Sequence, residues 1–342
     1  MEKVFTVTLQ GGKTTDVFFA DSIKDLSSKL SSYGLNALWV FDTNTAPLFK
    51  NLPPNRIVLE SGEKSKNWKS IERIISAALD FHLARDSYFI AFGGGVVCDM
   101  TALASSLYMR GTKLILVPTT LLCMVDASVG GKTAVNLEAG KNLMGAFYQP
   151  SLVICDCDTF ETLPEEVYRE GLAEAIKYGV ILDNELFNKF KEDALKDIES
   201  IIEQCVYLKG QIVSEDEFDK GQRQLLNFGH TIGHAIEKCS SFTLPHGFAV
   251  AMGMIAITRA SENSGLCEKG SLKLLEEVLQ KYKLPTSLPY SSTELSEAAL
   301  SDKKRLGDTI TLVVPERIGS CILHKISVED LKKFIDLGRE LK

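Results

Sequence analysis

Short apolar runs alternate with amphipathic stretches along the first 160 residues of the chain. The apolar runs predict strands at 37–41, 56–60, 88–92, 114–117 and 152–155. Apolar positions three and four apart predict helices at 67–81 and 96–109. Ahead of them, strands at 3–9 and 16–19 flank Gly11-Gly12 as in a hairpin, and a short amphipathic helix is expected at 22–30. Strands that alternate with helices are typical of a parallel sheet covered on both faces.

Helical spacing prevails after about residue 160. Helices are predicted at 164–180, 185–194, 197–213, 226–237, 246–263 and 271–282, and strands only at 309–314 and 321–325. We therefore expect an α/β domain at 1–160 and a mostly α-helical domain at 161–342. The length of 342 residues agrees with two domains, because single cores rarely grow beyond about 250–300 residues. The cleft between the domains is the expected site.

Composition narrows the class of protein. Hydrophobic residues make up 45% and charged residues 24%, as in an ordinary soluble domain. The formal net charge of −7, without a basic block, argues against binding to nucleic acid or to an anionic membrane. No apolar run is long enough to span a membrane, and the N-terminus lacks the apolar region of a signal peptide. The eight cysteines show no CxxC spacing, so we expect reduced, buried thiols in the cytoplasm.

The stretch at 222–237 is rich in side chains that bind metals and anions. Five polar residues there are spaced by 4, 3, 4 and 3, and would form one stripe on a continuous helix: Arg223, Asn227, His230, His234 and Glu237. The spacing pairs His230 with His234, and His246 follows shortly after. Ordinary core or surface histidines are the alternative, but this clustering favours a metal site, which Glu170 or Glu174 would complete.

Glycines and polar residues follow two predicted strands of the first domain. Gly93-Gly94-Gly95 lies between a strand and a helix, where backbone N–H groups bind phosphate well. The spacing is not GxGxxG, and a tight turn is the alternative. Asp42 and Asn44 follow another strand and are candidates for a ribose hydroxyl, with a helix cap as the alternative. These features favour a Rossmann-like, dinucleotide-binding first domain.

Several lysines are candidates for binding anions. Gly130-Gly131-Lys132-Thr133 ends like a P-loop, but Asp126 stands where that motif needs its first glycine. Lys132, Lys141 and Asn142 are therefore either anion ligands or solvated surface groups. Lys209 interrupts an apolar helical stripe, so it either extends its amine to solvent or meets an anion. Glu174 and Lys177 form either a surface pair or part of a buried face.

Together these stretches resemble the 3-dehydroquinate synthase family over residues 42–319. The resemblance rests on a set of motifs in order: GEKSK at 62–66, GGGVVCD at 93–99, RG at 110–111, PTTLLCMVDASVGGKTAVN at 118–136, GKNLMGAFYQP at 140–150, TLP at 162–164, GLAEAIKYG at 171–179, LLNFGHTIGHAIE at 225–237, HG at 246–247 and DKK at 302–304. The combination is specific, whereas no single motif is.

The resemblance implies a dehydroquinate synthase-like fold and an NAD- and zinc-dependent, cobalt-tolerant lyase of the shikimate pathway. Such an enzyme converts 3-deoxy-D-arabino-heptulosonate 7-phosphate into 3-dehydroquinate and phosphate. The sequence of steps is transient oxidation by NAD, elimination of phosphate, reduction, ring opening and aldol closure. Residues 1–160 would bind NAD, and residues 161–342 would bind the metal and the substrate. A homodimer is also implied, with Arg110 reaching the active site of the other subunit.

The resemblance also implies roles for individual residues. The metal ligands would be Glu174, His230 and His246, in place of the His230–His234 pair that spacing alone suggests. The substrate would be bound by Asp126, Lys132, Asn142, Lys177, Lys209, Arg223, Asn227 and His234, by Arg110 of a second subunit, and by Lys303 or Lys304. NAD would be bound by Asp42, Asn44, Glu63, Lys66, Gly94, Gly95, Asp99, Thr119, Thr120, Lys132, Lys141 and Thr162.

Two residues depart from the family pattern. Cys98 replaces a glycine after GGGVV, and Asp219 replaces a glutamate; we expect both to tune the site without abolishing activity. The rival functions are a sister cyclase whose sugar phosphate lacks a carboxylate, a metal-dependent polyol dehydrogenase, and a catalytically inactive relative. Lys209 and Arg223 disfavour the first, since two cations need an anion. The phosphate-binding lysines disfavour the second, and the complete metal-ligand set disfavours the third.

Overall fold

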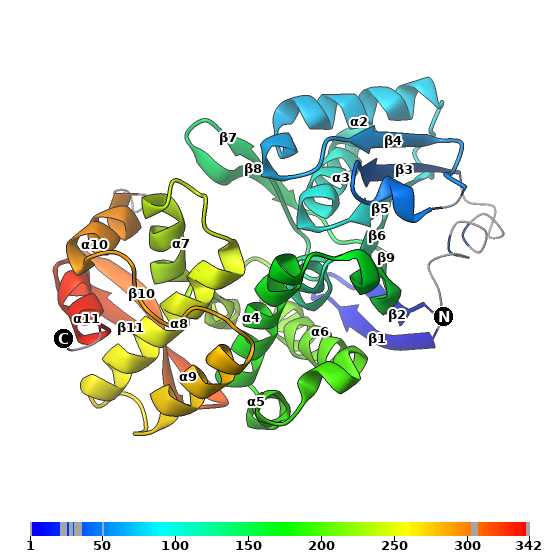
Figure 1. Cartoon of the computed structure of the whole chain (residues 1–342). Coiled ribbons are helices and arrows are strands. Elements are labelled where there is room, and N and C mark those ends of the chain that lie inside the picture. The colour runs from blue at the N-terminus through cyan, green and yellow to red at the C-terminus, as the bar shows by residue number, and fades with distance from the viewer. Residues whose placement is uncertain are drawn as a thin grey trace. The chain divides into compact units, whose positions relative to one another are not determined.

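The computed structural model describes residues 2–20, 26, 30, 36–49, 51–301 and 307–339 (Figure 1). The chain divides into two compact units, with Met1–Pro164 and Ile202–Phe218 in unit 1, and Glu165–Ile201 and Asp219–Lys342 in unit 2. The chain therefore passes between the units three times, and the functional division at residue 160 stays a prediction. Most of the helix predicted at 22–30, and both Lys303 and Lys304, lie outside the described residues.

Unit 1 is built on a sheet of seven strands in the order β1-β2-β9-β6-β5-β3-β4. The strands are β1 (Glu2–Thr8), β2 (Thr14–Phe19), β3 (Ala37–Asp42), β4 (Arg56–Leu59), β5 (Tyr88–Gly93), β6 (Lys113–Pro118) and β9 (Leu152–Cys155). β1 and β2 form the predicted antiparallel hairpin, and all other neighbours pair in parallel. The Rossmann-like parallel sheet predicted from the sequence is confirmed.

The sheet is buried on both faces because its central strands are apolar at most positions. All six residues of β3 are buried. Trp39 and Phe41 pack in one core with Phe92 of β5 and Val117 of β6, while the intervening residues of β3 face the opposite side. The helices α2 (Trp68–Asp80) and α3 (Gly95–Leu107) pack on this sheet and on each other.

Parallel pairing brings four strand ends to one edge of the sheet. β9, β6, β5 and β3 are consecutive parallel neighbours, so the residues that follow their carboxyl ends share that edge. Ligands of open α/β sheets bind at this edge. Asp42, the triple glycine, Thr119-Thr120 and the segment up to Thr162 all follow these ends.

Unit 1 also contains a second hairpin that the sequence reading missed, formed by β7 (Lys132–Leu137) and β8 (Gly140–Phe147). A Cβ atom at Gly145 would lie 1.8 Å from the carbonyl oxygen of Thr133, so only glycine allows the two strands to approach here. The helix α6 (Ile198–Glu215) groups with unit 1 from Ile202 onward.

Unit 2 is mostly helical, as predicted. Its helices are α4 (Glu165–Ile181), α5 (Asn184–Lys191), α7 (His230–Cys239), α8 (His246–Asn263), α9 (Ser271–Lys281), α10 (Ser292–Ser301) and α11 (Leu331–Leu337). The predicted strands at 309–314 and 321–325 form a longer antiparallel pair, β10 (Thr309–Arg317) and β11 (Ser320–Ser327). α10 and α11 were not predicted.

The stretch at 222–237 is not one continuous helix, and the helix predicted at 226–237 begins four residues later, at His230. Residues Gln222–Asn227 form a 3₁₀ helix, and Gly229, with a left-handed φ of 77°, precedes α7. The glycines serve helix packing: Cβ atoms at Gly229 and Gly253 would meet backbone oxygens at 2.8 and 2.1 Å, respectively. Gly229 and Gly233 thus allow α8 to approach α7 closely. This close packing explains why the stretch contains glycines, although each glycine inside a helix lowers its stability by about 1 kcal/mol.

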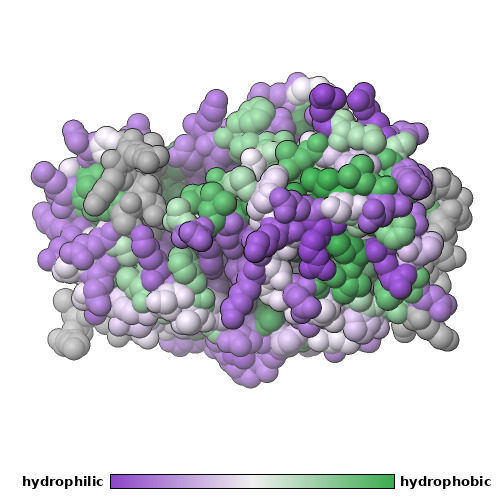
Figure 2. Space-filling view, turned by 90° about the horizontal axis from the view of Figure 1, so that it is seen from above, coloured by the Kyte–Doolittle hydropathy of each residue, from purple (hydrophilic) through white to green (hydrophobic). Residues whose placement is uncertain are grey.

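Within the described residues, no helix is long and apolar enough to cross a membrane. Figure 2 shows one face of the molecule, where hydrophilic side chains are interspersed with hydrophobic areas.

Candidate active site

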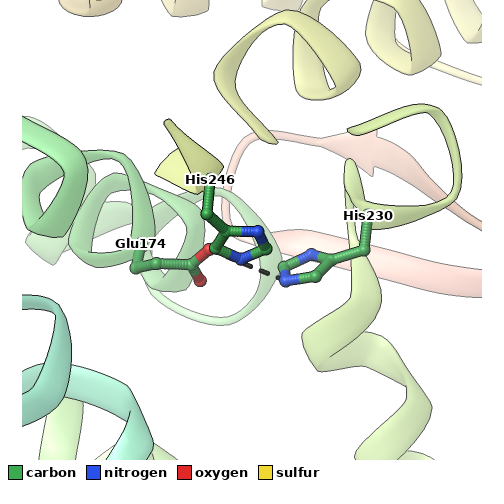
Figure 3. Close-up of side chains that lie close together, drawn as sticks. All are labelled: Glu174, His230 and His246. Carbon is green, nitrogen blue, oxygen red and sulfur yellow. Dashed lines mark ion pairs between the residues drawn. The ribbon is translucent and has the colours of Figure 1, made fainter. Parts of the chain in front are cut away.

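Three side chains of unit 2 form a group suited to a metal ion. Glu174 of α4, His230 of α7 and His246 of α8 each offer a ligand atom within 4.8 Å of the others (Figure 3). The Nε2 atoms of His230 and His246 lie 3.6 and 3.5 Å from the same oxygen, Oε1 of Glu174. Two imidazoles and one carboxylate are a typical ligand set for a catalytic divalent metal.

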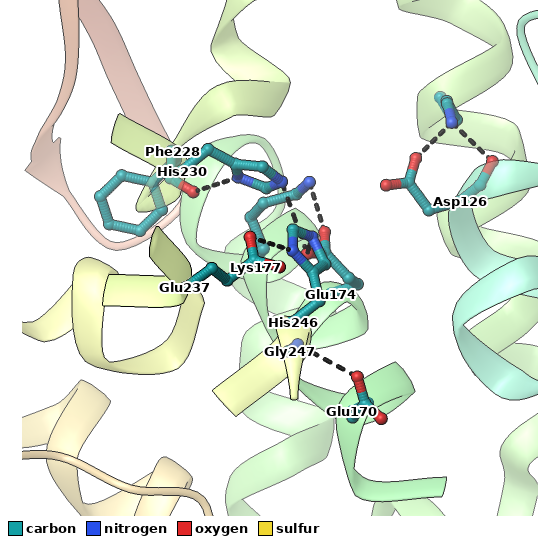
Figure 4. Close-up of polar contacts among 10 residues, drawn as sticks. Asp126, Glu170, Glu174, Lys177, Phe228, His230, Glu237, His246 and Gly247 are labelled. Carbon is teal, nitrogen blue, oxygen red and sulfur yellow. Dashed lines mark hydrogen bonds and ion pairs between the residues drawn. The ribbon is translucent and has the colours of Figure 1, made fainter. Parts of the chain in front are cut away.

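The other nitrogen of each imidazole is held by the protein. His230 Nδ1 lies 3.1 Å from the carbonyl oxygen of Phe228, and His246 Nδ1 lies 3.1 Å from Oε2 of Glu237 (Figure 4). Hydrogen bonds of this kind fix the ring orientation and leave Nε2 for a metal. Glu237 is buried. It lies on the polar stripe of the sequence, but no individual role was predicted for it.

The charged groups at the site shift one another's pKa values. Burial opposes ionisation of Glu174, but Lys177, His230 and His246 together outweigh it and hold the pKa of Glu174 well below its usual value. Burial and the Lys177 charge lower the pKa of His230 to about 3, so its imidazole is neutral at pH 7. Burial would lower the pKa of His246 as well, but hydrogen bonds to Glu174 and Glu237 raise it to about 10.

The residues present fit a metal ion. Both carboxylate oxygens of Glu174 are buried; Oε2 pairs with the Lys177 ammonium, whereas Oε1 has only long contacts with the Nε2 atoms of His230 and His246, at 3.6 and 3.5 Å. A buried carboxylate oxygen normally has a close partner, so a cation between Glu174 and the two imidazoles accounts for the placement of Oε1. The group draws its three side chains from three different helices.

Gly247 sets the distance between two of those helices. A Cβ atom at this position would lie 2.4 Å from the carbonyl oxygen of Glu170 and 2.6 Å from its Cα atom. The backbone of α8 therefore touches α4 beside His246, one turn of α4 before Glu174. The Gly247 N–H also lies 3.5 Å from Oε2 of Glu170, where a carboxylate favours the N-terminus of α8 (Figure 4).

The other site residues predicted in unit 2 differ in exposure. Lys177 is buried, with its Nζ 2.5 Å from Oε2 of Glu174, so the buried-face alternative for this pair is correct. Arg223 is only 1% exposed, which means that its permanent charge lies inside the protein. Asn227 and His234 are exposed, and the His234 ring lies 5.4 Å from that of His230 and 5.9 Å from that of His246.

In unit 1, Lys209 meets an internal anion. Its Nζ donates to the carbonyl oxygen of Asp126 at 2.5 Å and also contacts the Asp126 carboxylate. Lys209 is buried, so the alternative in which it extends to solvent is wrong.

The glycine turn at the sheet edge is shaped by close packing. Gly94 caps α3, and a Cβ atom there would lie 3.0 Å from the Thr120 side chain. The amide of Thr119 donates to the carbonyl oxygen of Gly93 at 3.0 Å. Asp42 accepts bonds from the Asn44 and Thr45 amides at 3.0 and 2.8 Å, so it stabilises its own turn.

Two predicted cofactor ligands pair with each other. Lys66 Nζ lies 2.6 Å from Oδ2 of Asp99. Burial raises the pKa of Asp99, although Lys66 partly opposes this effect. Thr162 donates to the carbonyl oxygen of Thr159 at 3.4 Å, in the segment after β9.

The candidate phosphate ligands lie on or near the β7–β8 hairpin. Lys132 opens β7 and is exposed, and Lys141 and Asn142 lie at the start of β8. Asn142 has a left-handed φ of 56°, which asparagine tolerates better than most residues. Arg110 is exposed and also left-handed, with φ 67°.

The two departures from the family pattern lie in different surroundings. Cys98 is buried beneath the glycine turn, with its Sγ 3.5 Å from the Gly93 carbonyl oxygen. Asp219 has a left-handed φ of 59°. Their effects on activity stay predictions.

Comparisons with known proteins place the chain in a family. Family profiles described as 3-dehydroquinate synthase N-terminal and 3-dehydroquinate synthase C-terminal match residues 56–170 and 171–305. The chain belongs to the 3-dehydroquinate synthase family. A family member from Clostridium beijerinckii, named 3-dehydroquinate synthase, is 43% identical over 278 residues, which cover 79% of each chain.

Solved structures extend the likeness of fold. A 2-deoxy-scyllo-inosose synthase complexed with carbaglucose-6-phosphate, NAD+ and Co2+ has a TM-score of 0.83 at 22% identity, covering 98% of this chain and 99% of that one. A 2-epi-5-epi-valiolone synthase from Streptomyces hygroscopicus, with NAD+ and Zn2+ bound, has a TM-score of 0.82 at 25% identity, covering 95% and 96%. The fold predicted from the resemblance to the synthase family is confirmed.

Proposed function

We propose that this chain is a 3-dehydroquinate synthase, which converts 3-deoxy-D-arabino-heptulosonate 7-phosphate into 3-dehydroquinate and phosphate. The observation that carries the proposal is the group of Glu174, His230 and His246, with Lys177 in contact, in a chain of this family. Such a reaction serves the shikimate pathway and the biosynthesis of chorismate and aromatic amino acids.

Glu174, His230 and His246 would hold a divalent zinc or cobalt ion. When bound, the metal supplies Lewis-acid chemistry at vicinal hydroxyls, and NAD supplies reversible hydride transfer. The neighbouring residues orient the two imidazoles and keep the carboxylate ionised. Phe228 and Glu237 hold the two imidazoles by Nδ1, so that both Nε2 atoms face Glu174. Lys177 keeps Glu174 ionised, because its ammonium lies 2.5 Å from the carboxylate.

Roles in binding the substrate follow from charge and burial. Arg223 brings a buried positive charge that suits the substrate carboxylate, and an arginine binds a carboxylate through two parallel hydrogen bonds. Asp126 and Lys209 form a partly buried pair that can exchange a proton with a substrate hydroxyl. The proposed ligands of the carboxylate and hydroxyls are Lys177, Lys209, Arg223 and Asn227, with Asp126 near the reacting carbon.

The phosphate group is proposed to bind a set of cations and donors: Lys132, Asn142, His234, Lys303 or Lys304, and Arg110 of a second subunit. Several positive charges around one phosphate stabilise it as a leaving group. The cofactor is proposed to bind Asp42, Asn44, Glu63, Lys66, Gly94, Gly95, Asp99, Thr119, Thr120, Lys132, Lys141 and Thr162.

A homodimer in the cytoplasm completes the proposal. If Arg110 acts on the other subunit, mixed dimers of Arg110→Ala and His246→Ala subunits contain one site with neither substitution. Mixing the two inactive variants should then restore part of the activity. Activity that stays at the level of the separate variants would contradict the crossing of Arg110.

The nearest alternative is a sister cyclase whose sugar phosphate lacks a carboxylate. The two solved cyclases described above are 22% and 25% identical to this chain, whereas the Clostridium synthase is 43% identical. The discriminating experiment compares kcat/KM for the heptulosonate phosphate with that for a carboxylate-free sugar phosphate of similar length. The proposal predicts turnover of the first only. Preferred turnover of the second would overturn it.

A further inference from the structure

Asn136, which has no role in the proposed site, lies at an irregularity of the β7–β8 hairpin. Pairing runs from Lys132 with Phe147 to Val135 with Met144, and then shifts before Leu137 pairs with Gly140. Asn136 therefore falls outside the regular ladder. Its backbone N–H donates instead to the carbonyl oxygen of Lys66 at 2.9 Å, so the hairpin is tied to the turn at Glu63–Ser65.

The side chain of Asn136 uses both ends of its amide. Nδ2 donates to Oε1 of Glu63 at 2.7 Å. Oδ1 accepts from the backbone N–H of Asn142 at 2.9 Å. The second bond holds the left-handed backbone of Asn142, an uncommon conformation for a residue other than glycine. One side chain thus fixes both the turn and the start of β8.

A further contact joins Lys66 directly to Asn142, so that Glu63, Lys66, Asn136 and Asn142 form a closed network of hydrogen bonds, which we call the Asn136 circuit. Lys66 Nζ donates to Oδ1 of Asn142 at 2.6 Å and pairs with Asp99 at 2.6 Å. Lys66 and Asn142 are therefore joined directly through their side chains and indirectly through Asn136. All of these residues belong to unit 1, so the circuit depends on one compact part of the chain.

We propose that Asn136 is a positioning residue that couples NAD binding to phosphate binding. The inference rests on the proposed function, which assigns Glu63 and Lys66 to the cofactor and Lys132 and Asn142 to the substrate phosphate. A ligand that orders the Glu63–Lys66 turn also orders Asn142, because Asn136 bonds to both. The coupling is reciprocal, so a bound phosphate tightens NAD to the same degree.

The test measures the dissociation constant of NAD by calorimetry on the metal-loaded enzyme, with and without saturating inorganic phosphate. In the unsubstituted enzyme, phosphate should lower the dissociation constant of NAD by roughly tenfold, within the usual range of coupling between two sites. The coupling ratio is the dissociation constant without phosphate divided by that with phosphate. Asn136→Ala should bring this ratio close to one, while NAD affinity without phosphate changes less. Glu138→Gln, at an exposed position in the turn of the same hairpin, should keep the ratio.

A pair of substitutions separates this role from a general loss of stability. Asn136→Asp places a carboxylate against Glu63 and should abolish the coupling. Glu63→Gln added to Asn136→Asp restores the bond with its direction reversed, since the glutamine amide donates to the aspartate and the aspartate still accepts from Asn142. The double variant should recover the ratio even if each NAD affinity is altered.

Two outcomes overturn the inference: a ratio near one in the unsubstituted enzyme, or an Asn136→Ala enzyme that keeps the ratio. Failure of the double variant to restore the ratio also counts against it. Turnover of the heptulosonate phosphate by the same unsubstituted preparation is measured in parallel. Normal turnover with no coupling refutes the role of Asn136 alone, whereas no turnover refutes the proposed function itself.

Discussion

Replacing Gly247 with alanine tests whether the contact between α4 and α8 sets the spacing of the metal ligands. The added Cβ would lie 2.4 Å from the Glu170 carbonyl oxygen, where an ordinary contact is at least 3.4 Å. The clash is with backbone, which cannot rotate away as a side chain can. The two helices must therefore separate by about 1 Å at this point, and His246 moves away from Glu174.

The expected consequences follow from that displacement. Metal–ligand distances hold to within about 0.2 Å, so a shift of about 1 Å should lower metal affinity by about 10- to 100-fold, as is typical when the groups that orient metal ligands are disturbed. Overpacking costs about 1–3 kcal/mol, and alanine regains about 1 kcal/mol in helix propensity. The free energy of unfolding should therefore fall by no more than about 2 kcal/mol.

Gly338→Ala is a matched control for the assay. A Cβ atom at Gly338 would lie 2.4 Å from the carbonyl oxygen of Ala256, also in α8. Ala256 lies ten residues after His246, about 15 Å further along the helix. Competition with a chromophoric chelator gives the affinity for zinc or cobalt, and thermal unfolding of the metal-free protein gives stability. Gly338→Ala should lose stability but keep its metal affinity.

The outcome that refutes the reasoning is a Gly247→Ala enzyme with unchanged metal affinity and reduced stability. The contact would then matter for packing alone. Equal loss of metal affinity in both variants would also count against it, because the effect would then reflect general destabilisation.

Three further predictions concern the metal and the substrate. His246→Ala should lose bound metal, and full occupancy by metal analysis would show that the ligand assignment is wrong. Arg223→Ala should lower kcat/KM by about 100-fold with metal content unchanged, since truncating one partner of a buried charge pair costs several kcal/mol; unimpaired turnover, or parallel metal loss, would contradict a role in binding the carboxylate. Metal uptake at pH 7 should release one proton, because the pKa of His246 is raised to about 10 and a ligand must be neutral. The apparent affinity for the metal should then rise about tenfold per pH unit. Calorimetry in two buffers of different ionisation enthalpy measures the number of protons released on metal binding. Metal uptake without proton release would refute the prediction.

The sheet of unit 1 was predictable because its strands carry the signal in their own residues. β3 and β5 are apolar up to their last residues, Asp42 and Gly93, and are bounded by polar or glycine-rich segments. The β7–β8 hairpin was missed because it mixes apolar residues with polar residues and glycine and few of its side chains are buried, so no clear periodicity marks it. The break at Gly229 was missed for the opposite reason, since helical spacing continues across it although the backbone does not.

The proposed metal site shows how far the spacing of residues along the sequence can predict a ligand set. His230 and His234 are four residues apart and suggest a pair, but the described structure brings His230 together with Glu174, which lies 56 residues earlier in the chain. Only tertiary folding creates that proximity, and the family resemblance anticipated it. Glu237 was visible on the polar stripe. Its part in holding His246 depends on the approach of α8, which the sequence does not encode locally.

The most direct test of the proposed activity follows inorganic phosphate and NADH absorbance together. The enzyme is supplied with NAD, zinc and the heptulosonate phosphate. A 3-dehydroquinate synthase returns the hydride in every cycle, so phosphate should be released in step with 3-dehydroquinate and with no net NADH. NADH that accumulates in proportion to substrate consumed, or product formed without phosphate, would contradict the account and favour a polyol dehydrogenase.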